Sequence, residues 1–435
     1  MSELRQSINS RGLILIVIGS CIGSGIFLTP SEIANELSQP SLIILLWILG
    51  GLITLSGALS YAELSSRFPS AGGVYVYLRE AFGRYPAFLF GWVVLTAVTS
   101  GALAALALAF TRFLVAIIPE VDDYKLPIAA GVIALTTFAN IFGVQVGQFF
   151  SNLFTSLKVM GILFVIVAGL FLVKDGVEVN WEIPSIDGNI LHHFFLALTG
   201  VYWSFGGWQH ATYISSEVIN PEKNIARAML AGSFIVMAVY ILSNLAYMNA
   251  LSIPEIASSE KVAADVLGVI FPGTGGKIMA CIVCISVFGT IAIYTMTAPR
   301  IYFAMAKDKV FFPFLAKVHP KYKTPINAIL IQSAWAILLL FFWGTFKDLI
   351  SYVTFTEGIF LALAALAVIV IRKKFKGTPH AGFKSPLYPI LPLFYFAVSI
   401  AFLSNGLIAN PIQALAALII FGAGSIVFFL IRKQV

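Results

Sequence analysis

Residues 19–27 read GSCIGSGIF and interrupt the first long apolar stretch of the chain, which runs from about residue 12 to residue 36. That stretch is long enough to cross a bilayer, for which about 20 apolar residues suffice. Each glycine in its middle weakens a helix by about 1 kcal/mol relative to alanine. Irregular backbone at membrane depth is tolerated only where it lines a cavity or is buried in protein. We therefore predict a break in a membrane-spanning helix, with close packing of two helices as the alternative.

A second interruption follows five spans later, where residues 202–208 read YWSFGGW. Its glycine pair lies mid-span and is flanked by aromatic residues. Paired glycine interruptions at matching positions in two halves of a membrane protein point to a substrate site. Because five is odd, two repeats of five spans must be inverted relative to each other. We predict a 5+5 inverted repeat with discontinuous helices 1 and 6, followed by two further helices, 11 and 12.

The composition of the whole chain fits a membrane protein. Its 435 residues are 59% hydrophobic and 11% charged, with a mean hydropathy of +0.93. A soluble domain averages roughly 45–50% apolar and about 25% charged residues. A soluble enzyme, a disordered chain and a disulfide-rich secreted domain are therefore excluded.

We predict an all-α membrane protein with twelve transmembrane helices. The predicted spans lie near residues 12–36, 41–66, 85–116, 126–141, 147–173, 192–216, 226–251, 273–307, 325–343, 347–371, 387–405 and 411–431. They divide the chain into a first repeat at 1–175, a second repeat at 176–371, and helices 11 and 12 with the C-terminus at 372–435.

The distribution of charge predicts the orientation of the chain. The net charge of +7 would also fit nucleic-acid binding, but the positions of the charges argue against it. Of the 27 lysines and arginines, 20 fall on one side of the predicted spans, six on the other, and Lys158 inside a span. The positive-inside rule places the 20 in the cytoplasm. We therefore expect a multi-pass protein of the cell membrane, in contact with lipid and not with nucleic acid, with both termini cytoplasmic and no cleavable signal peptide.

The chemistry of two broken helices suits a zwitterion. A break frees backbone N–H groups at the start of one half-helix and C=O groups at the end of the other. The N–H end suits a carboxylate, whereas the C=O end suits an ammonium. An α-amino acid carries both groups on one carbon. Two adjacent breaks therefore predict an amino acid site that needs no formal protein charge.

Four regions of the sequence resemble L-type amino acid transporters, a family of the amino acid–polyamine–organocation superfamily. The first helix is matched at residues 18–30, and the second helix with its re-entrant segment at residues 61–64 and 70–75. The sixth helix and its following turn are matched at residues 205–208 and 217–224, and the approach to helix 11 at residues 383–389. The resemblance covers nearly the whole chain. It implies a leucine-transporter-type fold and a bacterial, stand-alone member.

The resemblance also implies roles for residues in the two breaks. The family's carboxylate-binding backbone falls on Gly23, Ser24 and Gly25, and its amine-binding carbonyls fall near Ser20, Cys21 and Trp203, with Gly206 close by. Trp203 takes the place of the family's aromatic gate, where phenylalanine is more usual; a packing role for this tryptophan is the alternative. The predicted substrate-binding set is Ser20, Cys21, Ile22, Gly23, Ser24, Gly25, Trp203, Ser204, Phe205 and Gly206.

Lys158 lies inside the predicted fifth span, about ten residues, or roughly 15 Å of helix, from either end. A charge near the bilayer centre costs at least about 2.5–3.5 kcal/mol. Snorkelling to the interface is the alternative, but the distance disfavours it. The resemblance places this ammonium near Gly19 and Ser20 of the first helix. It also places it near Ser286 and Thr290 of the eighth, where sodium-coupled relatives bind a cation, which implies sodium-independent transport.

Glu357 is a second charge within a span, about fifteen residues before the basic cluster that starts at Arg372. The family commonly has asparagine at this position. A carboxylate here could accept a proton, pair with Lys158 or with a substrate amine, or take part in gating. The alternative is a protonated glutamate hydrogen-bonded to a neighbour. Glu63, near the cytoplasmic end of the second span, is expected to cap that helix or pair with Arg67.

Together these observations predict a sodium-independent transporter that exchanges small or medium neutral L-amino acids by alternating access. A proton-coupled symporter on the same fold is the alternative, and a receptor or channel has less support. The predicted coupling and gating residues are Lys158, Trp203, Ser286, Thr290 and Glu357.

The sequence contains no catalytic triad, P-loop or cysteine–histidine cluster with metal spacing, so no enzyme activity, metal or cofactor is expected. The predicted external loop at 120–125 has no cysteine, so no disulfide-linked heavy chain is expected.

Overall fold

The computed structural model describes residues 4–174, 176–183, 188–342, 346–378, 380, 382–409 and 411–432. Within these ranges the chain is helical apart from turns, loops and an isolated bridge between Ile8 and Val218. In chain order the elements are α1 (Ser10–Cys21), α2 (Gly25–Glu36), α3 (Pro40–Arg67), α4 (Val74–Phe82), α5 (Arg84–Val93), η1 (Val94–Val98), α6 (Thr99–Ile117), η2 (Pro119–Tyr124), α7 (Lys125–Ile141), α8 (Val144–Phe171), α9 (Gly188–Ser204), α10 (His210–Tyr213), η3 (Ser215–Glu217), α11 (Pro221–Ala250), α12 (Ile253–Ser258), α13 (Val262–Ile270), α14 (Gly275–Thr297), α15 (Pro299–Lys307), η4 (Pro313–Ala316), α16 (Ile326–Phe342), α17 (Phe346–Lys374), α18 (Ile390–Ala409) and α19 (Pro411–Arg432).

Six helical stretches among the described residues are long and apolar enough to cross a membrane. They are Pro40–Arg67, Arg84–Ile117, Pro119–Ile141, Val144–Phe171, Pro221–Ala250 and Gly275–Lys307. α1 and α2 together form a further candidate span, bent by 43° at the interruption between them. Shorter apolar helices cover Ile326–Phe342, Ile390–Ser404 and Ala417–Ile431.

These lengths and compositions are those of a multi-pass membrane protein, as the sequence predicts. The count of twelve spans and the inverted repeat remain predictions. The repeat boundary predicted after residue 175 lies at a gap in the described residues.

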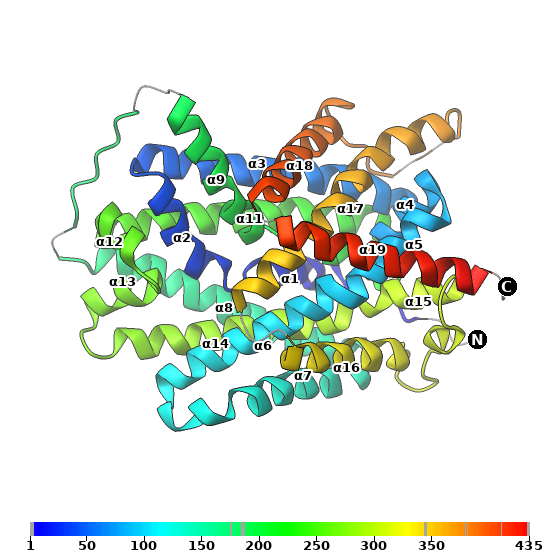
Figure 1. The fold of residues 1–435 in the computed structure, drawn as a ribbon, viewed down its shortest axis with the longest axis horizontal. Coiled ribbons are helices and arrows are strands. Elements are labelled where there is room, and N and C mark those ends of the chain that lie inside the picture. The colour runs from blue at the N-terminus through cyan, green and yellow to red at the C-terminus, as the bar shows by residue number, and fades with distance from the viewer. Residues whose placement is uncertain are drawn as a thin grey trace.

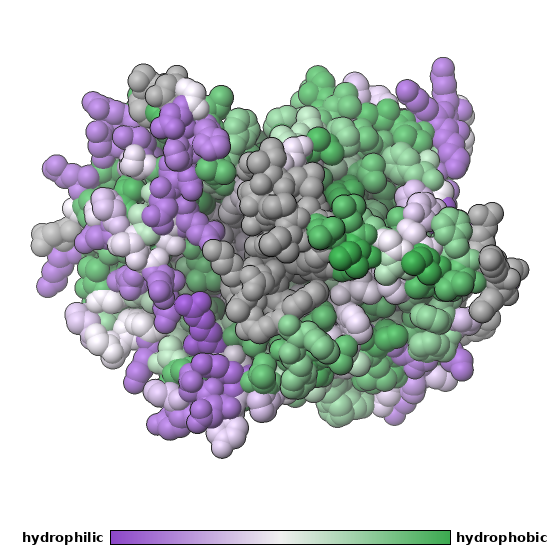
Figure 2. Space-filling view, viewed as in Figure 1, coloured by the Kyte–Doolittle hydropathy of each residue, from purple (hydrophilic) through white to green (hydrophobic). Residues whose placement is uncertain are grey.

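Most long helices run roughly along the long axis of the molecule, with α1 near its centre (Figure 1). α1 contacts α8, α10, α11 and α14, while α2 packs against α9 and α12. The beginning and the end of the described chain lie at the same end of this axis (Figure 1). Hydrophilic residues gather over the end that contains α12 and α13, and hydrophobic residues predominate over much of the right-hand half (Figure 2). A central α1 surrounded by other helices places its interruption inside protein, where irregular backbone is tolerated.

A fully buried ion pair joins the segment after α10 to α15. Glu217 and Arg300 have 0% and 1% of their side chains exposed, and Arg300 Nε donates to Glu217 Oε1 over 2.7 Å. The backbone N–H groups of Ser7 and Ile8 donate to the Glu217 carbonyl over 2.9 and 3.0 Å. Removing one partner of a buried pair typically costs 3–5 kcal/mol. This contact therefore holds the N-terminal segment, η3 and α15 together.

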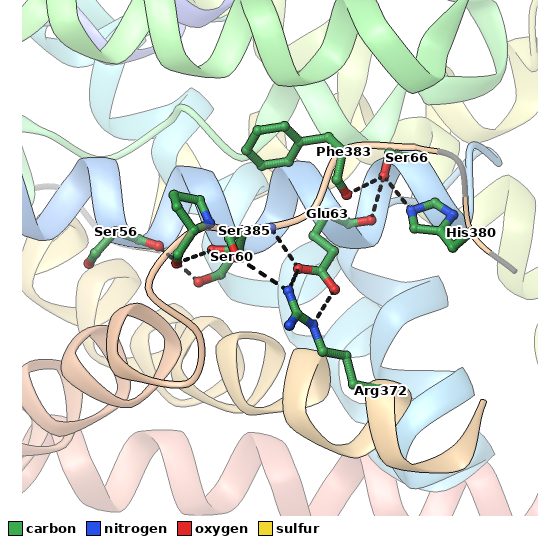
Figure 3. Close-up of polar contacts among 9 residues, drawn as sticks. Ser56, Ser60, Glu63, Ser66, Arg372, His380, Phe383 and Ser385 are labelled. Carbon is green, nitrogen blue, oxygen red and sulfur yellow. Dashed lines mark hydrogen bonds and ion pairs between the residues drawn. The ribbon is translucent and has the colours of Figure 1, made fainter. Parts of the chain in front are cut away.

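Glu63 joins α3 to α17 and to the loop before α18 (Figure 3). Its carboxylate accepts two hydrogen bonds of 2.7 Å from Arg372 and one of 2.8 Å from the backbone N–H of Ser385. The expected pairing with Arg67 is wrong: that guanidinium lies over the Phe375 ring, 4.6 Å from its centroid. Both arginines carry the same fork of donors, so position decides: Arg67 lies over Phe375, whereas Arg372 of α17 places two parallel donors on the carboxylate.

Candidate functional site

The first interruption divides one span into two half-helices. α1 ends at Cys21 and α2 begins at Gly25, so residues 22–24 connect the two. The backbone N–H of Ile22 still donates to the Ile18 carbonyl over 2.9 Å, which completes the last turn of α1. Beyond it, the Gly23 N–H donates to the Cys21 carbonyl over 2.9 Å, and no further helical turn follows α1 or precedes α2. The segment singled out by its glycines is therefore the place where the helix stops and restarts.

The second interruption follows α9, which ends at Ser204, and the next helical turn, α10, begins only at His210. Gly207 between them has φ +112°, and a Cβ placed on it would lie 2.4 Å from the Ser20 carbonyl oxygen. Only glycine suits both the backbone conformation and this close approach. The sequence predicts that the sixth span continues to residue 216. In the structure, the part after the interruption is instead the four-residue α10 followed by the 3-10 turn η3.

Direct hydrogen bonds hold the two interruptions together. The Tyr240 hydroxyl of α11 lies 3.0 Å from the Cys21 carbonyl oxygen and 2.8 Å from the Ser204 carbonyl oxygen. The hydroxyls of Thr29 and Ser204 are 2.8 Å apart. Tyr240 is completely buried, and its ring packs against Trp47 and Phe205. The carbonyl ends of α1 and α9 therefore lie on either side of one hydroxyl, and their relative position is set by α11.

A cavity lies between the interruptions, α6 and α17. The space bounded by its lining residues, including the part open to solvent, is about 840 Å³. The interruptions supply Ser20, Cys21, Gly23, Ser24, Gly25, Trp203, Ser204, Gly206 and Gly207. The other walls include Val98, Thr99, Ala102, Ala105, Leu106, Gln209, His210, Thr290, Tyr294 and Glu357.

Most residues of the predicted substrate-binding set therefore meet at one cavity, and two do not line it. Trp203 lines the cavity and is partly exposed. Phe205 is buried, with its ring centroid 5.9 Å from that of Trp47 and 5.0 Å from that of Tyr240. Ile22 is also buried, and it contributes its backbone carbonyl to polar contacts behind the cavity wall.

Lys158 of α8 contacts the end of the first half-helix. Its side chain is 1% exposed, and Nζ lies 2.9 Å from the Gly19 carbonyl oxygen and 2.6 Å from that of Ile22. The third contact is with the Thr290 hydroxyl of α14, at 2.8 Å. An ammonium has three N–H donors, so all of them have acceptors here. The side chain thus places its nitrogen at the negative, C=O end of α1, which favours the charged form of the amine.

Ser286 and Thr290 complete this contact from α14. The Ser286 hydroxyl donates to the carbonyls of Ile22 and Gly23, each over 3.2 Å. The Thr290 hydroxyl is within 3.1 Å of the Gly19 carbonyl oxygen and 3.3 Å of that of Ile22. An oxygen-rich environment of this kind suits a cation, and here the lysine ammonium takes that position.

Glu357 of α17 lies on the cavity wall and contacts Gln209 instead of Lys158. Gln209 Nε2 donates to Glu357 Oε1 over 2.6 Å, and Gln209 Oε1 accepts from the Gly207 backbone N–H over 3.0 Å. Gln209 is 1% exposed, whereas Glu357 is partly exposed. The glutamine thus connects a backbone group of the second interruption to a carboxylate at the cavity.

Sequence reasoning missed Tyr240, Gln209 and the Glu217–Arg300 pair. Gln209 directly follows the glycine-rich segment, so its position next to the break could have been inferred. An apolar helix with a tyrosine gives a weaker signal: its hydroxyl needs a partner when buried, but the sequence does not say which. Glu217 lies within a quoted motif, yet its partner is 83 residues away in the chain.

Comparison with known proteins assigns the chain to a family. A family model described as amino acid permease matches residues 8–431. The serine/threonine exchanger SteT of Bacillus subtilis (strain 168) is 31% identical over 438 aligned positions, which cover 99% of this chain and 98% of the relative. The large neutral amino acids transporter small subunit 2 of Mus musculus is 31% identical, covering 95% and 79% of the two chains. The b(0,+)-type amino acid transporter 1 of the same organism is 27% identical, covering 98% and 88%. The chain therefore belongs to the amino acid permease family.

Proposed function

We propose that this protein is a sodium-independent carrier that exchanges small or medium neutral L-amino acids across the cell membrane by alternating access. The observation that carries the proposal is the contact of Lys158 with the broken first helix. Its ammonium takes three oxygens, from Gly19, Ile22 and Thr290, within a shell that would otherwise suit a metal cation. A resident positive charge at this point removes the need for sodium.

The two interruptions supply the substrate contacts in this proposal. The N–H groups at the start of α2, from Gly23, Ser24 and Gly25, bind the substrate carboxylate at the positive end of a half-helix. Carbonyls near Ser20, Cys21 and Trp203 bind the ammonium. Trp203, partly exposed on the cavity wall, acts as the aromatic gate. One similar protein is named a serine/threonine exchanger and another a large neutral amino acids transporter subunit. These names support exchange of small or medium neutral amino acids.

The proposal includes an architecture: twelve spans, a 5+5 inverted repeat, and both termini in the cytoplasm. We also propose that the carrier works without a disulfide-linked heavy chain. Cys21 and Cys284 are buried, and Cys281 lies in a predicted span. Accessibility of single cysteines introduced in the predicted loops at 120–125 and 376–380 to a membrane-impermeant thiol reagent tests the orientation. Labelling of both from the same side would contradict it.

A proton-coupled symporter is the second candidate, because Glu357 places a titratable carboxylate on the cavity wall. The carboxylate would bind a proton with the substrate and release it on the other side. In this candidate an inward proton gradient drives uphill uptake without internal amino acid.

Flux measurements in proteoliposomes separate the candidates. Purified protein is reconstituted with or without internal amino acid, in sodium or choline buffer, and with or without a pH gradient. Exchange predicts uptake that depends strongly on internal substrate and is equal in the two buffers. Uptake that needs sodium contradicts the first proposal, and uphill uptake into empty vesicles driven by pH favours the second. Absence of any amino acid flux contradicts both.

A further inference from the structure

The wall of the cavity combines apolar and polar groups. From η1 and α6, Val98, Ala102, Ala105 and Leu106 present apolar groups, and Thr99 lies among them. Glu357 of α17, a helix packed against α6 and η1, presents a carboxylate, and within the part of the chain that the structure describes, Gln209 supplies its hydrogen bond. An apolar wall alone discriminates poorly between substrates of similar shape, whereas a polar group built into it discriminates strongly.

We propose that Glu357, oriented by Gln209, recognises a hydrogen-bond donor on the substrate's side chain, so that the carrier prefers amino acids bearing a side-chain hydroxyl or ammonium. This inference rests on the proposed function, because it assumes that the cavity binds an amino acid. It deepens that function by naming the side-chain group that is recognised: a hydroxyl keeps the substrate neutral, whereas an ammonium would extend the substrates beyond neutral amino acids.

The orientation of the Gln209 amide is determined by its neighbours. The Gly207 backbone N–H can only donate, so the Gln209 oxygen faces it and the Gln209 nitrogen faces away. That nitrogen donates to Glu357 Oε1 over 2.6 Å. The amide cannot turn without placing two donors or two acceptors against each other. Gln209 is therefore a positioning residue that holds the carboxylate against the cavity.

The exposure and surroundings of Glu357 leave it able to accept another hydrogen bond. An ionised carboxylate has about four acceptor positions on its two oxygens, and among the described residues one donor, Gln209, binds Oε1. The ammonium of Lys158 bonds elsewhere, because its three N–H donors are taken by Gly19, Ile22 and Thr290. Because Glu357 is partly exposed on the cavity wall, its remaining acceptor positions suit a donor carried by the substrate.

Pairs of amino acids with the same shape test this inference. Threonine and valine differ by a hydroxyl in place of a methyl, and 2,4-diaminobutyrate and norvaline differ by an ammonium in place of a methyl. Each is used as a competitor of exchange in proteoliposomes of the wild-type protein. A hydrogen bond to a charged group contributes roughly 1.5–3 kcal/mol, so we expect the donor-bearing member of at least one pair to compete about tenfold better or more. Equal competition in both pairs overturns the inference but leaves the proposed function intact if exchange itself occurs.

Variants show which donor is recognised and by which residue. Glu357→Leu should remove the preference in both pairs, while valine and norvaline still exchange. Glu357→Gln keeps a carbonyl acceptor but loses the charge, so it should keep a hydroxyl preference and lose an ammonium preference. Gln209→Leu should weaken the preference several-fold by freeing the carboxylate. Glu222→Leu and Glu222→Gln, at an exposed glutamate of α11, are the matched controls and should leave every ratio unchanged. A preference that persists in Glu357→Leu overturns the inference, and loss of all exchange in the wild type contradicts the proposed function instead.

Discussion

Lys158 and Glu357 both lie in the middle of predicted spans, and their surroundings differ. Lys158 is buried, and each of its N–H donors has an acceptor from α1 or α14. Glu357 is partly exposed on the cavity wall, and Gln209 provides its hydrogen bond among the described residues. The first charge is fully used by the protein, whereas the second keeps bonding capacity toward the cavity.

This difference indicates different roles. A buried charge is tolerated when it is paired and hydrogen-bonded on all sides, and then it holds other groups in place. A charge with unused acceptor positions on a cavity suits a ligand or a proton. We therefore expect substitutions at Lys158 to affect transport of every substrate, and substitutions at Glu357 to affect the choice among substrates.

The largest effect is expected for Lys158→Ala. The change removes the ammonium from the Gly19 and Ile22 carbonyls and leaves them only the hydroxyl contacts of Ser286 and Thr290. Each hydrogen bond to a charged group contributes about 1.5–3 kcal/mol. Exchange of all amino acids should fall by about 100-fold or more, as measured by uptake of labelled substrate into preloaded proteoliposomes. Lys174→Ala, at an exposed lysine after α8, serves as the control. If Lys158→Ala keeps both flux and apparent affinity, the contrast between the two charges has no functional meaning.

A smaller effect, common to all substrates, is expected for Tyr240→Phe. It removes the one hydroxyl that lies between the Cys21 and Ser204 carbonyls, at a loss of about 1–2 kcal/mol. Exchange should fall by roughly tenfold without a change in substrate order. Tyr247→Phe removes a longer contact of 3.4 Å to the Ile26 carbonyl and should have less effect. Equal effects of the two variants would show that the Tyr240 bridge has no special role.

Glu357→Gln should reduce exchange of small apolar amino acids by no more than a few-fold. The amide retains the size of the side chain and an acceptor, so the interruptions that bind the substrate backbone stay in place. Initial uptake of labelled valine over a range of concentrations separates effects on affinity from effects on maximal rate. Complete loss of valine exchange would place Glu357 with Lys158 among the residues that every substrate needs. Loss restricted to uptake driven by a pH gradient would instead support proton coupling.

The smallest effect on transport is expected for Glu63→Gln. Three hydrogen-bond donors surround the Glu63 carboxylate, just as three acceptors surround the Lys158 ammonium. Glu63, however, lies near the end of α3 and is not among the residues that line the cavity. The change should lower the free energy of unfolding by about 1–2 kcal/mol, seen as a lower Tm in detergent, with exchange rates per folded protein unchanged. A selective loss of exchange at full stability would show that this contact takes part in the transport cycle.

Much of the site was accessible to prediction because its signals are local. Glycines at 23, 25, 206 and 207 weaken helices wherever they occur, so the interruptions could be located from the sequence. A lysine in the middle of an apolar stretch must face polar groups, which indicated an interior position for Lys158. The length of the second half of the sixth span was not predictable in this way. Its end at α10 depends on packing against other helices, among them α1, α11 and α14.

Partners far apart in the chain were beyond the reach of the sequence. Glu63 was expected to pair within its own helix, and instead it binds Arg372, 309 residues away. Glu357 was considered as a partner of Lys158 or of substrate, and in the structure it contacts Gln209 at a distance of 148 residues along the chain. Such choices depend on which donors the packing of helices brings within about 3 Å.

The sequence by itself determined that the chain is a helical membrane protein, where two of its helices break, and which intramembrane charges require explanation. These properties follow from hydropathy, helix propensity and the cost of a charge in lipid, all of which act on a residue and its immediate neighbours. Only the tertiary structure decided that all three N–H donors of Lys158 have acceptors, while among the described residues Glu357 has the single donor Gln209. That distinction depends on counting donors and acceptors from separate helices, and only packing puts those groups in contact.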